Sequence, residues 1–434
     1  MKSTGFFYVL GISFILFFFW GENQNPKLNE EELFYPLLVN KFYQQNQNKL
    51  FWFTASSVSK ELRQALITVL DSSISYTLIA QPYHYKELKE NIEKIPSDTI
   101  PLMKIDRIFT DAAIAGIKDI YGGYKITPWV SYDQVSSKFV NYDNDYLVSC
   151  LRDVQSPVEL INLAKLLQPQ EKEYKILKQG LKLEKEKADK EKIQKLTISL
   201  NYFRWIHHFR LPQCIVVNIA SAYLRYYEND SVKLLMKVVL GKPSTPTPRF
   251  AAYCDQVILY PYWNVPRNIT LNELLPKFKR NPSAIDAMNM QVIDANGKII
   301  DHYKLNWSSF SSKYFPYSVR QSTGCDNALG VIKFNLTSPY SVFLHDTNNK
   351  TAFFSGLRYY SHGCIRIEQP IELANYLLQN KLDTAFLQAC YRDQKPVPLA
   401  LDTAVPVFVT YMPTEVYPSG KIMYYKDVYG LLKK

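Results

Sequence analysis

The stretch that decides the fold and the chemistry of this chain is Tyr340–Pro370, which reads YSVFLHDTNNKTAFFSGLRYYSHGCIRIEQP. It begins with alternating apolar side chains, Val342 and Leu344, and this pattern predicts a strand that ends at His345. A polar turn follows, and a second segment rich in β-forming residues then leads to Ser361-His362-Gly363-Cys364. The sequence therefore predicts one histidine at a strand end and a cysteine beside a second histidine at a turn.

This arrangement supplies the two groups that thiol chemistry needs. The thiolate is the nucleophile, so an imidazole must take or share the thiol proton. Gly363 has no Cβ, so the backbone can turn sharply there and present the Cys364 N–H to a developing oxyanion. The alternative is a buried structural cysteine with two unrelated histidines, because cysteine is among the most buried residue types.

Longer patterns around this stretch resemble one enzyme family. The motif H-x(15)-SHGC-x-R resembles the signature of the L,D-transpeptidase catalytic domain of the YkuD type, whose members are cysteine enzymes that remodel peptidoglycan. Arg320–Thr347, RQSTGCDNALGVIKFNLTSPYSVFLHDT, resembles the larger members of the family, which carry a scaffold domain. The segments IVVNIASAYLRYYEND and YPYWNVPRNIT resemble the start of the same domain, and VFVTYMPTEVYPSGKIMYYKDVYG resembles its end.

The resemblance implies a mechanism and a set of site residues. Cys364 would attack a tetrapeptide stem between its third residue and the terminal D-Ala, and His345 would act as the general base. A stem amine would resolve the thioester to give a 3→3 cross-link, and N–H groups of His362, Gly363 and Cys364 would stabilise the oxyanion. The residues that we expect to contact substrate are Arg366, Ser361, Asn327 and Tyr360.

Two of these assignments have plain alternatives. Arg366 could bind a carboxylate of the donor, or could form an ion pair with Glu368 or Glu372. Ser361 could orient a neighbouring group or only shape the turn. The acceptor also stays open, because water would make the enzyme an L,D-carboxypeptidase and a protein amine would make it a wall-anchoring transferase. A non-catalytic wall-binding scaffold protein is the alternative of another class.

The N-terminus predicts export. Lys2 precedes an apolar run from Phe6 to Trp20, which is short for a membrane span of roughly 20 residues and suits a signal-peptide core within residues 1–21. No small-x-small cleavage site is evident, so an uncleaved membrane anchor remains an alternative. We therefore expect the bulk of the chain in the periplasm or cell envelope.

Composition fits an exported globular protein. The chain has 434 residues, enough for about two domains, and 47% of them are hydrophobic. Its net charge of +11 suits a wall or membrane surface, and no basic cluster is interleaved with stacking aromatics, so nucleic acid is not an expected partner. The expected partners are peptidoglycan stem peptides and carbapenem-type inhibitors, and no metal or cofactor is implied.

The six cysteines lack CxxC spacing, so neither a structural zinc site nor a dense disulfide framework is expected. Cys325 lies in the loop STGCDNALG, which the resemblance places close to the catalytic centre. The favoured expectation is a buried and inert thiol. The alternatives are a structural disulfide with Cys254 or another cysteine, and a reversible disulfide with Cys364.

The expected fold class is α+β, with a mainly helical scaffold domain over residues 28–210 and a mainly β catalytic domain over 213–412. Helices are predicted at Glu61–Leu70, Asp106–Gly123 and Ser156–Leu167. The Lys/Glu-rich run that follows reads as a solvated helix, and it leaves no room for the small peptidoglycan-binding-like module that the family usually carries.

From Cys214 onward the sequence period changes to that of strands. The residues Glu-Asn-Asp at 228–230 predict a hairpin turn. By resemblance, 271–319 would form a capping subdomain, with a helix at LNELLPKFKR and a strand at KIIDHYKLNW. Residues 413–434 would form a C-terminal hairpin.

Overall fold

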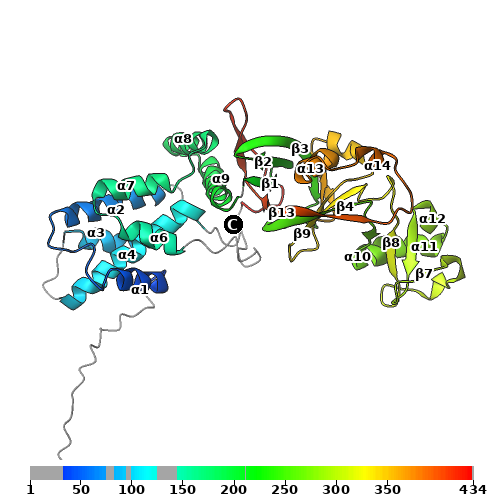
Figure 1. Cartoon of the computed structure of the whole chain (residues 1–434), viewed down its shortest axis with the longest axis horizontal. Coiled ribbons are helices and arrows are strands. Elements are labelled where there is room, and N and C mark those ends of the chain that lie inside the picture. Colours follow the sequence, from blue (N-terminus) through cyan, green and yellow to red (C-terminus); the bar gives the residue numbers. More distant parts are fainter. Residues whose placement is uncertain (1–32, 75–82, 94–98, 125–143, 211, 433–434) are drawn as a thin grey trace, which may run out of the picture.

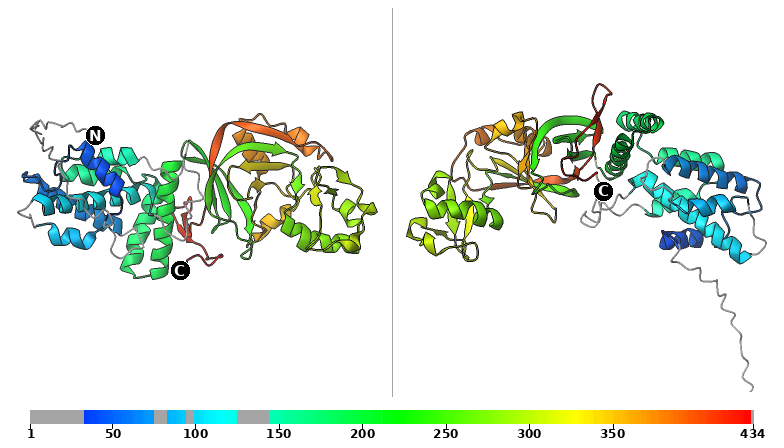
Figure 2. Two further views of the ribbon diagram at one scale, coloured as in Figure 1. Left: turned by 90° about the horizontal axis from the view of Figure 1, so that it is seen from below. Right: turned by 180° about the vertical axis from the view of Figure 1, so that it is seen from behind.

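A computed structural model of the chain describes residues 33–74, 83–93, 99–124, 144–210 and 212–432. The predicted signal peptide or anchor lies outside these residues. None of the helices that the structure describes is both long and apolar enough to cross a membrane. The helical part, the main sheet and a smaller second sheet lie in a row along the longest axis of the molecule (Figure 1), and two further views show the same order (Figure 2).

The N-terminal part is helical, as predicted. Ser156 caps one helix by accepting the N–H of Glu159, and the acidic residue Asp106 lies inside a helix that starts earlier than expected. The helices are α1 (Pro36–Gln45), α2 (Val58–Ile74), α3 (Tyr85–Asn91), α4 (Thr99–Gly122), α6 (Asn144–Arg152), α7 (Pro157–Leu166), α8 (Lys172–Glu186) and α9 (Lys190–Phe209).

The Lys/Glu-rich run differs from the prediction of a simply solvated helix. It forms two helices, α8 and α9, which break at residues 187–189 and pack against each other. One apolar stripe of the pair, including Leu177 and Leu196, is buried and packs on Ile422 and Tyr424 of the C-terminal hairpin. The long lysine and glutamate side chains occupy the remaining faces. The buried stripe is narrow, so charged residues dominate the sequence of both helices.

The main sheet contains most of the strands of the C-terminal part, in the order β11-β3-β12-β10-β9-β4-β13-β1-β2. The predicted hairpin turn is confirmed at Asn229–Asp230, where both residues have positive φ. Because β3 pairs with β2 through its first half and with β12 and β11 through its second, the sheet closes on itself. Its strands are β1 (Gln213–Asn218), β2 (Tyr223–Glu228), β3 (Ser231–Gly241), β4 (Phe250–Leu259), β9 (Ile332–Leu336), β10 (Leu344–His345), β11 (Tyr359–Ser361), β12 (Ile365–Ile367) and β13 (Val397–Thr410).

A second unit is inserted between β4 and β9 and has its own core. Its four-stranded sheet has the order β5-β8-β6-β7, and its buried residues include Phe278, Trp307 and Phe315. We call residues 263–321 the cap. Its elements are β5 (Trp263–Asn264), α10 (Arg267–Ile269), the π-helix η3 (Thr270–Leu274), α11 (Leu275–Arg280), α12 (Ala284–Ala287), β6 (Met290–Ile293), β7 (Ile299–Ile300), the 3₁₀ turns η4 (His302–Lys304) and η5 (Trp307–Ser309), and β8 (Ser318–Gln321).

Two predicted strands are much shorter in the structure. KIIDHYKLNW gives only the two residues of β7, because Asp301 accepts the N–H of Tyr303 and starts a 3₁₀ turn, and Trp307 Nε1 bonds the carbonyl of His302. The strand expected from Tyr340 is confined to β10, because Pro339 lacks an N–H and the Tyr340 N–H bonds Ser338 instead of a ladder partner.

The chain after β12 completes the domain. A helix, α13 (Pro370–Leu377), covers the core face of the sheet with Leu373 and Ala374, and α14 (Thr384–Gln388) follows. The remaining elements are the 3₁₀ turn η6 (Lys350–Phe354) and the hairpin β14 (Thr414–Val416) with β15 (Ile422–Tyr424). The fold class is therefore α+β, as the sequence predicted.

Candidate active site

One face of the main sheet carries the reactive side chains. Along β9 the side chains of Ile332 and Phe334 are buried in the core, whereas Lys333 between them is half-buried on the other side. The register pairs His345 of β10 with Lys333 on one side and with Arg366 of β12 on the other. Paired residues of neighbouring strands point to the same face, so these three side chains lie in a row about 4.8 Å apart from strand to strand.

The nucleophile candidate, Cys364, lies directly before β12 and on the same face, because it is two residues before Arg366. Its Sγ points toward the Ser341 carbonyl at 3.7 Å, and the N–H of the next residue bonds the carbonyl of Phe343. Burial raises the pKa of the Cys364 thiol, and the nearby cations Lys333 and Arg366 act against this rise. At rest the group is therefore a thiol.

The turn before Cys364 is clamped from two sides. Ser361 Oγ accepts the Gly363 N–H at 3.1 Å and donates to the Cys364 carbonyl at 2.6 Å, and Thr247 donates to the Gly363 carbonyl at 2.8 Å. Gly363 has a φ of +121°, a conformation that a residue with a Cβ rarely adopts. Its N–H is committed to Ser361, whereas the N–H groups of His362 and Cys364 have no acceptor among the described residues and can serve as oxyanion donors.

The base candidate, His345, is buried, with 4% of its surface exposed. Its Nδ1 donates to the Asp346 carbonyl, which leaves Nε2 with the free lone pair. Burial, with the charges of Arg366 and Lys333, lowers the pKa of His345 to about 3. The imidazole is therefore neutral near pH 7 and able to accept a proton. No hydrogen bond joins it to Cys364 in the part of the chain that the structure describes.

Asp346 fixes the turn that orients His345. Its carboxylate accepts the N–H groups of Val331 and Thr347 and pairs with Lys350. Gly330 touches this carboxylate so closely that a Cβ there would lie 2.2 Å from Asp346 Oδ2. Asp346 was not among the predicted site residues, although an acidic residue directly after a candidate base is a signal for such a brace.

His362 connects the nucleophile turn to the cap. Its Nε2 lies 2.8 Å from Oε1 of Glu273, which belongs to η3. The side chain thus points to the cap, and the predicted oxyanion role of this residue would fall to its backbone N–H.

Three of the residues predicted to contact substrate have hydrogen-bond partners of their own in the structure. Asn327 is wholly buried and bonds the carbonyls of Pro261 and Ser322, so it braces a loop and cannot contact substrate directly. Ser361 is also buried and shapes the turn. Tyr360 is half-exposed, and its hydroxyl bonds its own loop at Leu357.

The ion pair considered for Arg366 is wrong. Glu368 pairs with Lys237 at 3.4 Å, and Arg366 has no carboxylate partner among the described residues. Lys333 was missed altogether. The signal for it was a single cation inside the otherwise apolar strand pattern Val331-Ile332-Lys333-Phe334.

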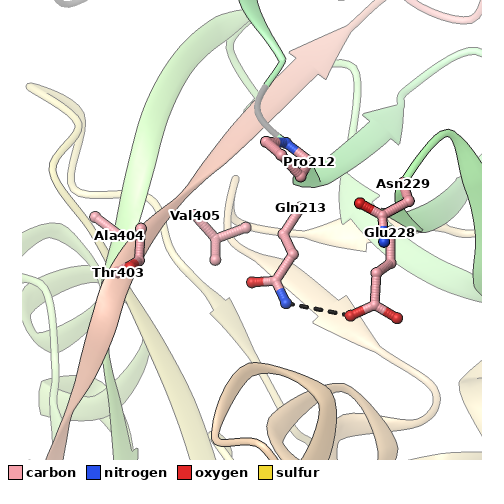
Figure 3. Close-up of a pocket in the computed structure, with 7 residues that line it drawn as sticks. All are labelled: Pro212, Gln213, Glu228, Asn229, Thr403, Ala404 and Val405. Atoms are coloured by element: carbon pink, nitrogen blue, oxygen red, sulfur yellow. Dashed lines mark hydrogen bonds between the residues drawn. The ribbon is translucent and has the colours of Figure 1, made fainter.

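A hollow of about 240 Å³ adjoins the nucleophile turn. Thr247, Arg249 and Tyr340 contribute to its lining, and Thr247 also bonds the Gly363 carbonyl. A larger hollow of about 270 Å³ lies at the edge of β1, β2 and β13, where Gln213 bonds Glu228 (Figure 3). That larger hollow contains none of the predicted site residues.

The pairing of the cysteines differs from the favoured expectation. Cys325 is not a buried inert thiol, because it forms a disulfide with Cys390. The option of a structural disulfide with another cysteine therefore holds, and in this structure Cys364 remains free. Among the described residues, no group of three or more His, Cys, Asp or Glu side chains could hold a metal ion.

A free thiol and an uncharged imidazole on one face of a sheet, beside a free backbone N–H, form the kind of site that enzymes with a cysteine nucleophile use. Residues 212–407 match the family model of the L,D-transpeptidase catalytic domain of the YkuD type, and residues 38–181 match the model of the scaffold domain. The chain therefore carries an L,D-transpeptidase catalytic domain of the YkuD type, preceded by a scaffold domain.

One curated relative resembles about half of the chain. A protein of Haemophilus influenzae named "Putative L,D-transpeptidase" is 34% identical over 238 residues, which are 55% of this chain and 48% of that protein. The chain thus spans about half the length of this curated relative.

The solved structures that resemble the chain do so with low sequence identity and low TM-scores. The catalytic domain of an L,D-transpeptidase from E. faecium, acylated by ertapenem, is 14% identical over 46% of this chain and 96% of that one, with a TM-score of 0.24. An L,D-transpeptidase from Mycobacterium smegmatis is 14% identical over 46% of this chain and 58% of that one, with a TM-score of 0.21.

Proposed function

We propose that the protein is an exported peptidoglycan L,D-transpeptidase that forms 3→3 cross-links through a thioester on Cys364. The observation that carries this proposal is the placement of Cys364, directly before β12, and His345, on the adjoining β10, on the same face, with His345 neutral. A neutral imidazole with a free Nε2 can accept the thiol proton, and catalytic hydrogen bonds often tighten only when substrate binds.

In the first half of the proposed reaction, Cys364 Sγ attacks the carbonyl of the third residue of a tetrapeptide stem. His345 Nε2 takes the thiol proton, and the Cys364 N–H stabilises the oxyanion. The C–N bond then breaks, the proton passes to the leaving D-Ala amine, and a thioester remains.

In the second half, the amine of a second stem attacks the thioester. His345 removes a proton from this amine, the C–S bond breaks, and the thiol is regenerated. The same thiol would be acylated by carbapenem-type β-lactams, whose strained amide presents a comparable carbonyl. The protein would act in the periplasm or cell envelope, reached through the apolar N-terminal run from Phe6 to Trp20.

The test is incubation of the purified protein with a disaccharide-tetrapeptide, followed by mass spectrometry of the products. A cross-linked dimer with release of D-Ala is expected. Tripeptide alone would replace the transferase with an L,D-carboxypeptidase. Unchanged substrate, from protein whose Cys364 still reacts with a thiol reagent, would favour a non-catalytic wall-binding protein.

A further inference from the structure

Two cations lie on the reactive face beside the nucleophile. Lys333 of β9 and Arg366 of β12 flank His345 in the strand register. The Lys333 ammonium lies over the Phe343 ring, 4.2 Å from its centre, so the side chain leans toward the Cys364 end of the strands. Burial lowers the pKa of both cations, and a negative charge on Cys364 would oppose that lowering.

Neither cation has a carboxylate partner in the part of the chain that the structure describes. Four acids of the surrounding segments have other partners. Glu368 pairs with Lys237, Glu273 with His362, Asp346 with Lys350, and Asp255 contacts the Asn335 amide at 3.5 Å. Half-buried cations without counter-ions are costly, and a bound anion offsets that cost.

We propose that Lys333 and Arg366 form a two-cation binding site for a carboxylate of the donor stem peptide, next to the Cys364 thiol. An Arg guanidinium binds a carboxylate through two parallel hydrogen bonds, and a Lys ammonium adds a compact charge from the other side. The two side chains come from strands on either side of β10, so an anion between them lies over His345 and close to Sγ. The identity of the ligand rests on the function proposed above, whereas the site itself can be tested without it.

The first test compares two alkylating reagents at Cys364. Iodoacetate carries a carboxylate and iodoacetamide does not, and with both the S–C bond forms as iodide leaves. The ratio of their rates, measured by peptide mass mapping, reports anion attraction and cancels any change in thiol reactivity. Lys333→Met should lower the iodoacetate/iodoacetamide ratio about fivefold, and Lys333→Arg should retain most of it.

A matched control separates the site from the net charge of the protein. Lys381 is on the surface, where it pairs with Asp402 at 3.2 Å, and Lys381→Met removes the same charge. Its alkylation ratio should equal that of the wild type. An unchanged ratio in Lys333→Met, or an equal fall in both variants, would overturn the proposed site.

The second test identifies the ligand. Tetrapeptide donors are prepared with one carboxylate amidated at a time. Amidation of the recognised carboxylate should raise KM about tenfold in the wild type and leave KM unchanged in Lys333→Met. If Lys333→Met lowers turnover of free and amidated donors by the same factor, the assignment to a donor carboxylate is wrong. If the wild type turns over no donor at all, the proposed function fails while the alkylation ratio still decides the anion site.

Discussion

The helical part and the reactive face of the sheet both contain buried or half-buried ionisable groups, but the two regions differ in whether these groups have partners. In the helical part, the buried carboxylate of Asp106 accepts the backbone N–H groups of Phe51, Trp52 and Phe53 and the hydroxyl of Tyr43. On the reactive face, Lys333 and Arg366 have no acidic partner within the described residues. Buried polar groups with complete hydrogen bonding stabilise a fold, whereas groups left incomplete indicate where a ligand binds.

The largest expected effect is on the reactive face, where one substitution should remove activity without changing stability. Cys364→Ala should abolish turnover and acylation, because it removes the only covalent path, while the unfolding midpoint stays close to that of the wild type. Product mass spectrometry and thermal denaturation measure the two quantities. Turnover by the folded variant would contradict the proposed mechanism.

The next effect concerns the base. His345→Ala should slow acylation by about 10²–10⁴-fold, which is the usual contribution of a positioned general base. Carbapenem acylation followed by mass spectrometry gives the rate. His302 of the cap, which lies near Asp286, offers a matched histidine control, and His302→Ala should acylate at nearly the wild-type rate. Equal rates in His345→Ala and the wild type would mean that another group takes the thiol proton.

In the helical part we expect the reverse, namely that a substitution lowers stability and leaves the reactivity of Cys364 unchanged. Asp106→Ala leaves several buried N–H groups without an acceptor, so we expect the free energy of unfolding of this part to fall by about 3 kcal/mol. Asp153→Ala, at an exposed carboxylate paired with Arg152, should change it by less than about 0.5 kcal/mol. Urea unfolding followed by circular dichroism measures both. Alkylation of Cys364 at low urea should be the same in both variants, and a loss of it would show that the two regions are coupled.

The charge state of the site gives a pH dependence. The pKa of His345 is lowered to about 3 and that of Cys364 is raised, so both groups are neutral near pH 7. Only the thiolate reacts, so iodoacetamide alkylation should rise about tenfold per pH unit from about pH 6 to about pH 8.5. Stopped-time mass spectrometry gives the profile. A plateau beginning near pH 6.5 would instead indicate a preformed thiolate–imidazolium pair.

The smallest expected effect concerns the contact between the cap and the nucleophile turn. Glu273→Gln keeps the shape of the side chain and weakens its bond to His362, so kcat/KM should fall only about threefold to fivefold. Glu191→Gln, at an exposed carboxylate that pairs with Lys195 far from the site, is the control. A fall of a hundredfold or more in Glu273→Gln would make this contact part of the catalytic machinery.

Much of the fold could be predicted because its signals are local. The helices around Leu70 and Ser156 and the Asn229–Asp230 turn follow from periodicity, capping and turn chemistry. The segment at residues 298–307 could not be predicted, because a capping aspartate and an indole N–H satisfy its backbone locally and override its β propensity.

The site could be predicted only in part for a related reason. Cys364 and His345 stand out by residue type, but Lys333 becomes meaningful only once the register places it opposite His345. Asn327 is polar and so could bind a substrate, but only the structure of its loop shows that its amide N–H groups donate to the backbone carbonyls of Pro261 and Ser322. The Cys325–Cys390 bond likewise joins residues that no sequence spacing connects.

The position of β13 in the sheet has a consequence for how the protein is made. This strand lies between β4 and β1, and so it joins segments that are synthesised between about 140 and about 190 residues before it. Until residues 397–410 have emerged, β1 has no partner on that side and β4 is an open edge. The nucleophile is thus synthesised before the strand that closes its domain. A growing chain carries the thiol well before it carries the finished enzyme.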